Sequence, residues 1–226
     1  MLKSLPRACF YAVLSGAALA LAACGGEPGS DTEEAGASET IDTTNKGALS
    51  EMALGAPDAP VTVIEYASIT CPHCATFHER VFPTIKKDYI ETGKVRFVFR
   101  EFPTAPAELS VVGSMLARCA ADKGGQDAYF LVLGSLFQTQ QKWIYGETRD
   151  ELMKIAAQAG LDQSDFDACV RRQELIDLIN GNVDAAVEKY RINSTPSFVI
   201  NGTLRNFSTV EAMSEALDEA LARAEG

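Results

Sequence analysis

The chain has 226 residues, of which 46% are hydrophobic and 23% are charged, and its formal net charge is −11. This acidic balance argues against binding to nucleic acid or electrostatic adhesion to anionic lipid, because both need a basic surface. No internal repeat is visible, and the region after residue 50 is long enough to build its own hydrophobic core.

The first 23 residues have the pattern of an export signal. Lys3 and Arg7 precede an acid-free, mostly apolar run over residues 8–23 that is too short to span a bilayer comfortably. The run ends in Leu-Ala-Ala-Cys, which resembles the lipobox of bacterial lipoproteins and predicts lipid modification at Cys24. A plain secretory signal is the alternative. Either interpretation places the protein in the periplasm or cell envelope, and the first adds a lipid anchor to the membrane.

Residues 24–50 are rich in Gly, Ser, Thr and acidic residues and almost lack large apolar side chains. Such a segment cannot bury enough surface to fold, which predicts a flexible acidic tether.

The folded part is expected to start at residue 51 with a strand, a helix and a second strand. The segment "VTVIEYAS" (61–68) alternates as a strand does, and "KVRFVFREF" (94–102) is the second strand. Between them, apolar residues recur at helical spacing over residues 72–88, where Pro83 predicts a kink. This is a βαβ order.

Residues 106–180 are predicted to be an inserted helical domain. One helix ends near Gly124 and Gly125, a second covers 128–138, and "DQSDFDACVRR" forms a later one. Before it, "TRDELMKIAAQAG" is expected to start with a capping box of Thr148 and Glu151 and to end on Gly160.

The remaining elements complete the order of strands and helices outside the insertion. A helix at 181–190 precedes a hairpin with a type I′ turn at Asn201-Gly202, and a last helix is expected to start with a capping box of Ser208 and Glu211. Without the insertion the order is β-α-β followed by α-β-β-α. The fold class is therefore predicted to be α/β, a thioredoxin-fold domain made of residues 51–105 and 181–226 with a helical insertion.

The stretch "TCPHC" places Cys71 and Cys74 two residues apart where a strand ends and a helix begins. Unpaired backbone N–H groups and the helix dipole at this place favour an anion, so Cys71 is expected to be a stabilised thiolate and Cys74 to be more buried. His73 between them can stabilise the thiolate further. A stable thiolate makes the disulfide oxidising, so the pair is predicted to give its disulfide away.

Two other interpretations of this stretch compete with redox chemistry. A purely structural disulfide would close a very short loop and add little stability. A zinc site could use Cys71, Cys74 and His78, but no second Cys/His pair lies nearby to complete the ligand set. No metal and no cofactor are therefore expected.

The stretch "EYASITCPHCATFH", the helical insertion and "STPSFVING" together resemble the DsbA family of envelope thiol-disulfide oxidoreductases, in particular its lipoprotein and BdbD-type members. The resemblance covers about residues 52–224. It implies that Cys71, followed by Pro72, is the nucleophile that forms mixed disulfides, and that Cys74 resolves them.

The resemblance also implies roles outside the cysteine motif. The Thr195-Pro196 bond is expected to be cis and to lie beside the disulfide, where its backbone would pair with an extended substrate chain. Glu65 matches the buried acid of the family, which can relay protons to the resolving cysteine; a strand carboxylate at a solvated face is the alternative. Best-known members have an acid where this chain has His78.

The other two cysteines after the tether, Cys119 and Cys169, each lie on the apolar face of a predicted insertion helix. In an oxidising compartment they are expected to form a structural disulfide, worth about 4 kcal/mol in the chain-entropy model. Two buried free cysteines are the alternative.

The leading hypothesis is an enzyme that oxidises cysteines of exported proteins and is itself reoxidised by a DsbB-like quinone-linked membrane partner. A reductase or isomerase of the same fold is the first alternative, because threonine before the cis proline also occurs in isomerase-type relatives. A non-catalytic module that holds client proteins is the second.

Overall fold

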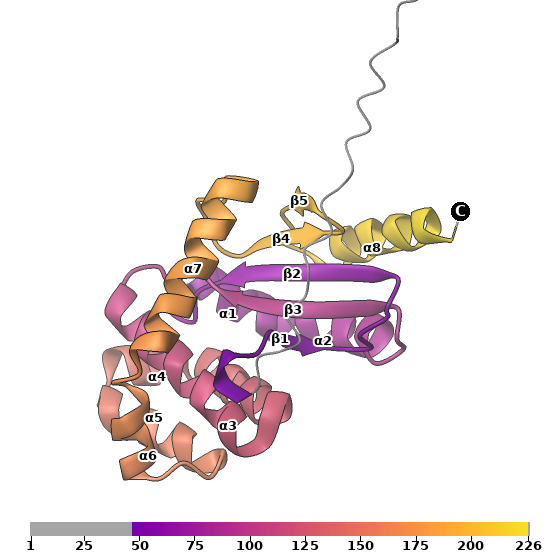
Figure 1. The fold of residues 1–226 in the computed structure, drawn as a ribbon. Helices are drawn as coiled ribbons and strands as arrows, with labels where there is room; N and C mark the ends of the chain where they lie inside the picture. The colour runs from indigo at the N-terminus through magenta and orange to yellow at the C-terminus, as the bar shows by residue number, and fades with distance from the viewer. Residues whose placement is uncertain (1–46, 226) are drawn as a thin grey trace, which may run out of the picture. The chain divides into compact units, whose positions relative to one another are not determined.

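A five-stranded mixed sheet organises residues 47–225, the part of the chain that this computed structural model describes (Figure 1). The signal segment, Cys24 and most of the expected tether lie outside the described residues. The strand order is β1-β3-β2-β4-β5, with β2 and β3 parallel and the other neighbours antiparallel. The strands are β1 (Met52–Leu54), β2 (Val61–Ala67), β3 (Val95–Glu101), β4 (Ser197–Ile200) and β5 (Thr203–Arg205).

Helices cover both faces of the sheet, which confirms the predicted thioredoxin-type α/β fold. Because side chains of a strand alternate between faces, Val61 and Val63 of β2 pack under α1 (Pro72–Arg80), α2 (Phe82–Ile85) and α8 (Val210–Ala224). Ile64 and Tyr66 pack on the other face, against α7 (Gln173–Tyr190). The strand is therefore apolar on both sides, as is usual at the centre of a parallel pair.

The helical insertion packs at one end of the sheet (Figure 1). It contains α3 (Ala107–Gln138), α4 (Gln140–Tyr145), α5 (Thr148–Gln158) and α6 (Gln163–Cys169). As expected, α3 is interrupted at Gly124 and Gly125, whose backbone angles are not helical. A disulfide with an S–S distance of 2.01 Å joins Cys119 of α3 to Cys169 of α6.

Several predicted boundaries differ from the structure. The expected kink at Pro83 is a break at Val81, after which Pro83 lies in the first turn of α2, where its missing N–H costs no hydrogen bond, and a π-helical segment, η2 (Lys86–Ile90), follows. α7 begins at Gln173 rather than at residue 181.

Two predicted capping boxes are wrong. α5 has Glu147 at its N-cap, so Thr148 is already helical, and no side chain caps this end. At α8 the cap is Thr209 rather than Ser208, and its side chain accepts a hydrogen bond from Ala212 N. A one-residue shift in the start of a helix moves the cap to a neighbouring residue, which the sequence pattern alone does not resolve.

The last residues of the predicted tether belong to the folded core. A 3₁₀ turn, η1 (Gly47–Leu49), lies against α3, where Ala48 N donates to Asp122 at 2.7 Å and the Arg118 guanidinium donates to Ala48 O at 2.9 Å. The short β1 then pairs with β3. Both elements are only three residues long, too short for a periodic pattern in the sequence.

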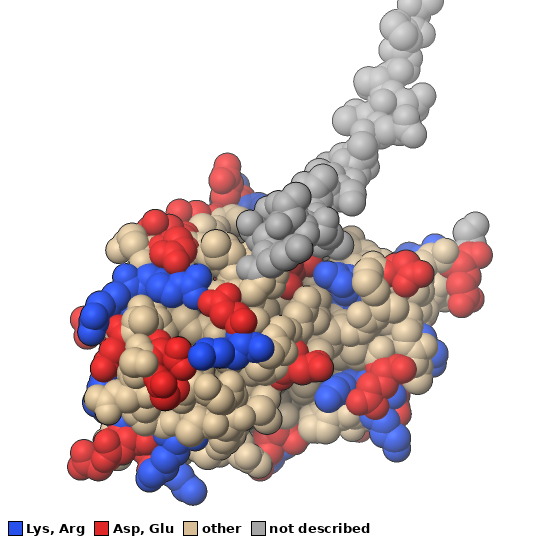
Figure 2. Space-filling model, turned by 60° about the horizontal axis from the view of Figure 1, so that its bottom comes forward, with Lys and Arg blue, Asp and Glu red and all other residues tan. Residues whose placement is uncertain are grey.

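Over residues 47–225, no helix is both long and apolar enough to cross a membrane. Figure 2 shows acidic and basic side chains interspersed over one face of the molecule.

Candidate functional site

Cys71 is the N-cap of α1, at the turn that leads out of β2. The side chain of Cys71 is nearly buried at 7% exposure, and Cys74, one turn into the helix, is fully buried. Both are free thiols, while Pro72 and His73 between them are exposed. The residue Cys71 is therefore slightly exposed, whereas Cys74 is enclosed by the protein.

The surroundings of Cys71 favour its thiolate. The pKa of Cys71 is lowered to about 5, chiefly by a hydrogen bond from the Cys74 thiol, which outweighs the opposing effect of burial. A hydrogen bond with the Thr195 side chain and the backbone N–H groups of Cys74 and His73 add to this effect. His73 acts here through its backbone at the helix N-terminus.

Cys74 has the opposite electrostatic environment. Burial raises the pKa of Cys74 far above its usual value, and the hydrogen bond that it gives to Cys71 and the nearby charge of Glu65 act in the same direction. The two cysteines are thus differentiated into a thiolate, Cys71, and a protonated thiol, Cys74.

Glu65 lies in β2 on the sheet face covered by α1, and its side chain is fully buried. Its Oε2 is 2.8 Å from Nε2 of His78, whereas its buried Oε1 has no hydrogen-bond partner. Glu65 is therefore a buried acid near Cys74 and not a strand carboxylate at a solvated face.

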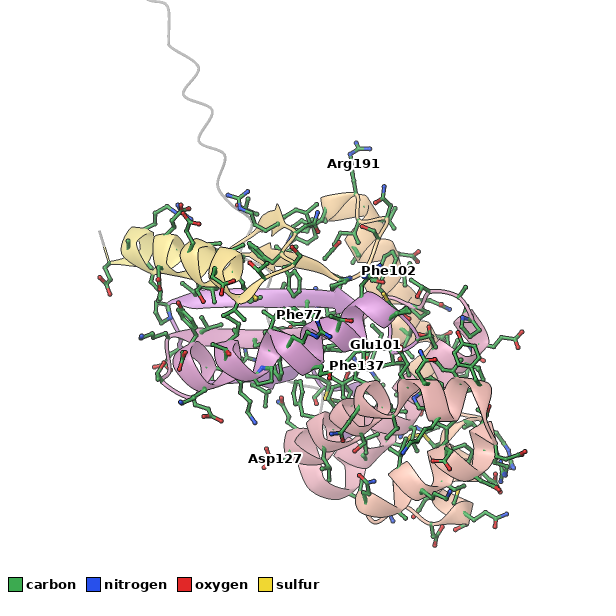
Figure 3. The ribbon with its side chains drawn as sticks, turned by 180° about the vertical axis from the view of Figure 1, so that it is seen from behind. Phe77, Glu101, Phe102, Asp127, Phe137 and Arg191 are labelled. Atoms are coloured by element: carbon green, nitrogen blue, oxygen red, sulfur yellow. A yellow bond between two sulfur atoms is a disulfide. The ribbon has the colours of Figure 1, made fainter. Side chains whose placement is uncertain are left out.

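His78 connects this buried acid to the helical insertion. Its ring stacks on Phe137 with 4.2 Å between centroids and meets Phe77 edge-on. Figure 3 shows Phe77 and Phe137 where the sheet layer meets the insertion. A groove lined by Ala75, His78, Phe82, Leu133 and Phe137, among others, runs along this junction. The sequence left the role of His78 undetermined. The structure places His78 in direct contact with Glu65.

The loop before β4 forms the other wall of the site. The Thr195-Pro196 peptide bond is cis, and Thr195 O lies 3.4 Å from Cys71 Sγ. The backbone of this loop is therefore beside the sulfur, as the resemblance implied. A second cis bond, Ala105-Pro106, precedes α3 and was not predicted.

The residues that a zinc site would need are arranged differently. Within residues 47–225 no group of three or more His, Cys, Asp or Glu side chains could hold a metal ion. His78, which that interpretation needed as a ligand, is bonded to Glu65 through its Nε2.

Contacts that hold the active-site turn were missed from the sequence. The side-chain amide of Gln140, at the start of α4, donates to Ile69 O at 2.8 Å and to Cys71 O at 3.0 Å. Ser68 Oγ is 2.9 Å from Ser110 Oγ of α3. Nothing in a single sequence signals these partners, because they are far from the motif along the chain.

Comparison with known proteins gives concordant matches. A family model described as thioredoxin matches residues 48–219. A putative protein-disulfide oxidoreductase of Rickettsia typhi is 32% identical over 183 residues, which are 80% of this chain and 66% of the relative. The probable disulfide bond formation protein D of Bacillus anthracis is 29% identical over 177 residues, 76% of this chain and 78% of the relative.

Solved structures agree. The crystal structure of alpha-DsbA1 from Wolbachia pipientis matches with a TM-score of 0.70 and 31% identity, covering 77% of this chain and 92% of that chain. The match to the Rickettsia typhi relative spans just under two thirds of that relative's length, at 66%.

Proposed function

Because the chain belongs to the DsbA-like thiol-disulfide oxidoreductases of the thioredoxin family, we propose that it is a protein thiol oxidase that introduces disulfides into exported proteins. The observation that carries this proposal is the opposite electrostatics of the two cysteines, a Cys71 thiolate with a pKa of about 5 beside a protonated Cys74. A stabilised thiolate in the reduced form makes the disulfide a strong oxidant.

In the first step, a substrate thiolate attacks Cys71 Sγ of the Cys71–Cys74 disulfide. A mixed disulfide forms, the bond between the two cysteines breaks, and Cys74 leaves with the electron pair. Because its site is buried, Cys74 must take up a proton. Glu65, the nearby buried acid, supports this transfer.

In the second step, another substrate thiolate attacks the substrate sulfur of the mixed disulfide. The substrate gains its disulfide and Cys71 leaves as a thiolate, for which the low pKa makes it a good leaving group. The enzyme is now reduced by two electrons. A DsbB-like quinone-linked membrane protein is the class of partner that would reoxidise it.

An extended substrate chain would bind along the loop of Thr195 and Pro196. The loop backbone is within 3.4 Å of Cys71 Sγ, so a strand added there would bring a substrate cysteine to the nucleophile. Export by the segment 1–23, with a lipid anchor at Cys24, would place this chemistry in the periplasm or cell envelope, tethered to a membrane.

The test is the equilibrium reduction potential of the full chain against glutathione. A value towards about −120 mV, typical of the strong oxidant of this superfamily, is expected. A value near about −270 mV, typical of thioredoxin, would make the protein a reductase and overturn the proposal. The alternative function, an isomerase or reductase, is supported by Thr195, because threonine before the cis proline also occurs in isomerase-type relatives.

The variant Cys71→Ser separates these enzymes from a client-binding module. Loss of all thiol exchange with retained binding of unfolded client protein would favour the module as a second function. Loss of exchange without such binding is the outcome that we expect.

A further inference from the structure

The turn that carries Cys71 is held from outside the thioredoxin fold. Between the end of β2 and the start of α1, the carbonyls of Ile69 and Cys71 both face the helical insertion, and both accept hydrogen bonds from the same side-chain amide, that of Gln140. Gln140 is 4% exposed, so these bonds are shielded from water. Inside a protein, such bonds are costly to leave unmade.

Gln140 is itself placed by a rigid support. It opens α4 directly after Thr139 ends α3. Trp143, fully buried in the same helix, donates from its indole nitrogen to Leu136 O at 2.8 Å and so ties α4 back to α3. The amide of Gln140 is therefore a fixed group and not a mobile surface side chain.

The Cys71 carbonyl has a second donor, Ala75 N at 3.1 Å, which is the first helical bond of α1. A carbonyl with two donors is fixed in direction, and it belongs to the residue whose sulfur reacts. The N–H groups of His73 and Cys74, which face Cys71 Sγ, lie in the same first turn. The direction in which these two N–H groups point depends on how this turn is oriented relative to β2.

We propose that Gln140 is a positioning residue for the reaction: by bonding the carbonyls of Ile69 and Cys71, it fixes the strand-to-helix turn so that the backbone donors of α1 converge on Cys71 Sγ. The inference rests on the proposed function, since it assigns the helical insertion a part in activating the nucleophile. Gln140 touches neither substrate nor the reacting sulfur, and it acts through the turn.

The test compares Gln140→Leu with Gln141→Leu in the full chain. The control makes the same chemical change at the next residue of α4, which is exposed. The readout is the pH dependence of iodoacetamide alkylation at Cys71 in the reduced protein, followed on the Cys71 peptide by mass spectrometry. Only the thiolate is alkylated, so the profile gives the pKa of Cys71.

We expect the pKa of Cys71 to rise by about one unit in Gln140→Leu. At a pH below the pKa, this rise corresponds to about tenfold less thiolate. In Gln141→Leu the pKa of Cys71 should stay unchanged. Equal profiles for the two variants would overturn the inference. If Gln140→Leu does not fold, Gln140→Asn, which keeps the amide but shortens its reach, is judged by the same comparison.

Failure of the proposed function gives a different result. A wild-type pKa of Cys71 near 8.5 would count against the oxidase, whatever the difference between the two leucine variants. A low wild-type pKa that is insensitive to Gln140 would leave the oxidase standing and remove only the role of Gln140.

Discussion

At the scale of single residues, the site is defined by where charge is placed around two sulfurs. Cys71 faces hydrogen-bond donors, while Cys74 faces apolar surroundings and a buried carboxylate. Glu65 is held at one carboxylate oxygen by His78.

Glu65→Gln is expected to slow the step in which Cys74 attacks a mixed disulfide at Cys71. The amide cannot accept the Cys74 proton, so we expect release of glutathione from a Cys71–glutathione adduct to slow by about 10- to 100-fold. Stopped-flow measurement of this release tests the role. Glu79→Gln, an exposed carboxylate of α1, is the matched control, and equal rates in both variants would remove Glu65 from the mechanism.

The low pKa of Cys71 predicts how stability depends on pH. Between about pH 5 and about 8.5, the reduced native protein holds fewer protons at Cys71 than the reduced unfolded chain does. Stability of the reduced form relative to the oxidised form therefore rises with pH across this window, and the gain is lost as pH falls towards about 5.

Thermal unfolding of both redox forms at pH 4.5 and pH 8 measures this difference. The reduced form should gain in Tm over the oxidised form at the higher pH. Reduced Cys71→Ser, which lacks the titrating thiol, should not show the gain, and a gain of equal size in that variant would assign the effect to other groups.

At the scale of elements, α3 is the helix of the insertion that packs against the active-site end of the sheet. Its first half packs beside the active-site turn through Ser110, and its second half brings Phe137 against His78. The two halves change direction at Gly124 and Gly125, and Gly125 has φ 65° and ψ −155°. Residues other than glycine rarely adopt this backbone conformation, because their Cβ makes it strained.

Gly125→Ala is expected to lower the free energy of unfolding by about 1–3 kcal/mol, because the bend cannot form without strain. Gly134→Ala is the control in the same helix, where an added Cβ meets nothing within 4 Å. That change should stabilise the protein by about 0.5–1 kcal/mol. Urea unfolding of both variants measures the contrast, and a Gly125→Ala protein as stable as wild type would contradict the requirement for the bend.

At the scale of the whole molecule, a buried polar network joins the sheet to the insertion and to the N-terminal segment. Arg118 of α3 donates to both carboxylate oxygens of Glu101 at 2.6 and 2.7 Å and also to the carbonyls of Ala48 and Ser50. Figure 3 shows Glu101 at the junction of the layers. Tyr129 and Asn182 complete the partners of this carboxylate.

Arg118→Met is expected to cost about 3–5 kcal/mol of stability, because it leaves Glu101 buried without its countercharge. Arg149→Met breaks the pair with Asp167, in which the arginine side chain is 54% exposed, and should cost about 1 kcal/mol or less. Chemical unfolding of the two variants measures the difference. Similar losses would show that burial does not set the strength of these pairs.

The amino-acid sequence by itself determined the order of the main elements and the nucleophilic turn, because periodicity, turn chemistry and motif spacing are local properties. The tertiary structure alone decided that His78 would hold Glu65, that Gln140 would clamp the Cys71 turn, and that residues 47–50 would join the core. These contacts join residues distant along the chain. Their energies depend on burial and mutual orientation, which arise only when the helical insertion packs against the sheet.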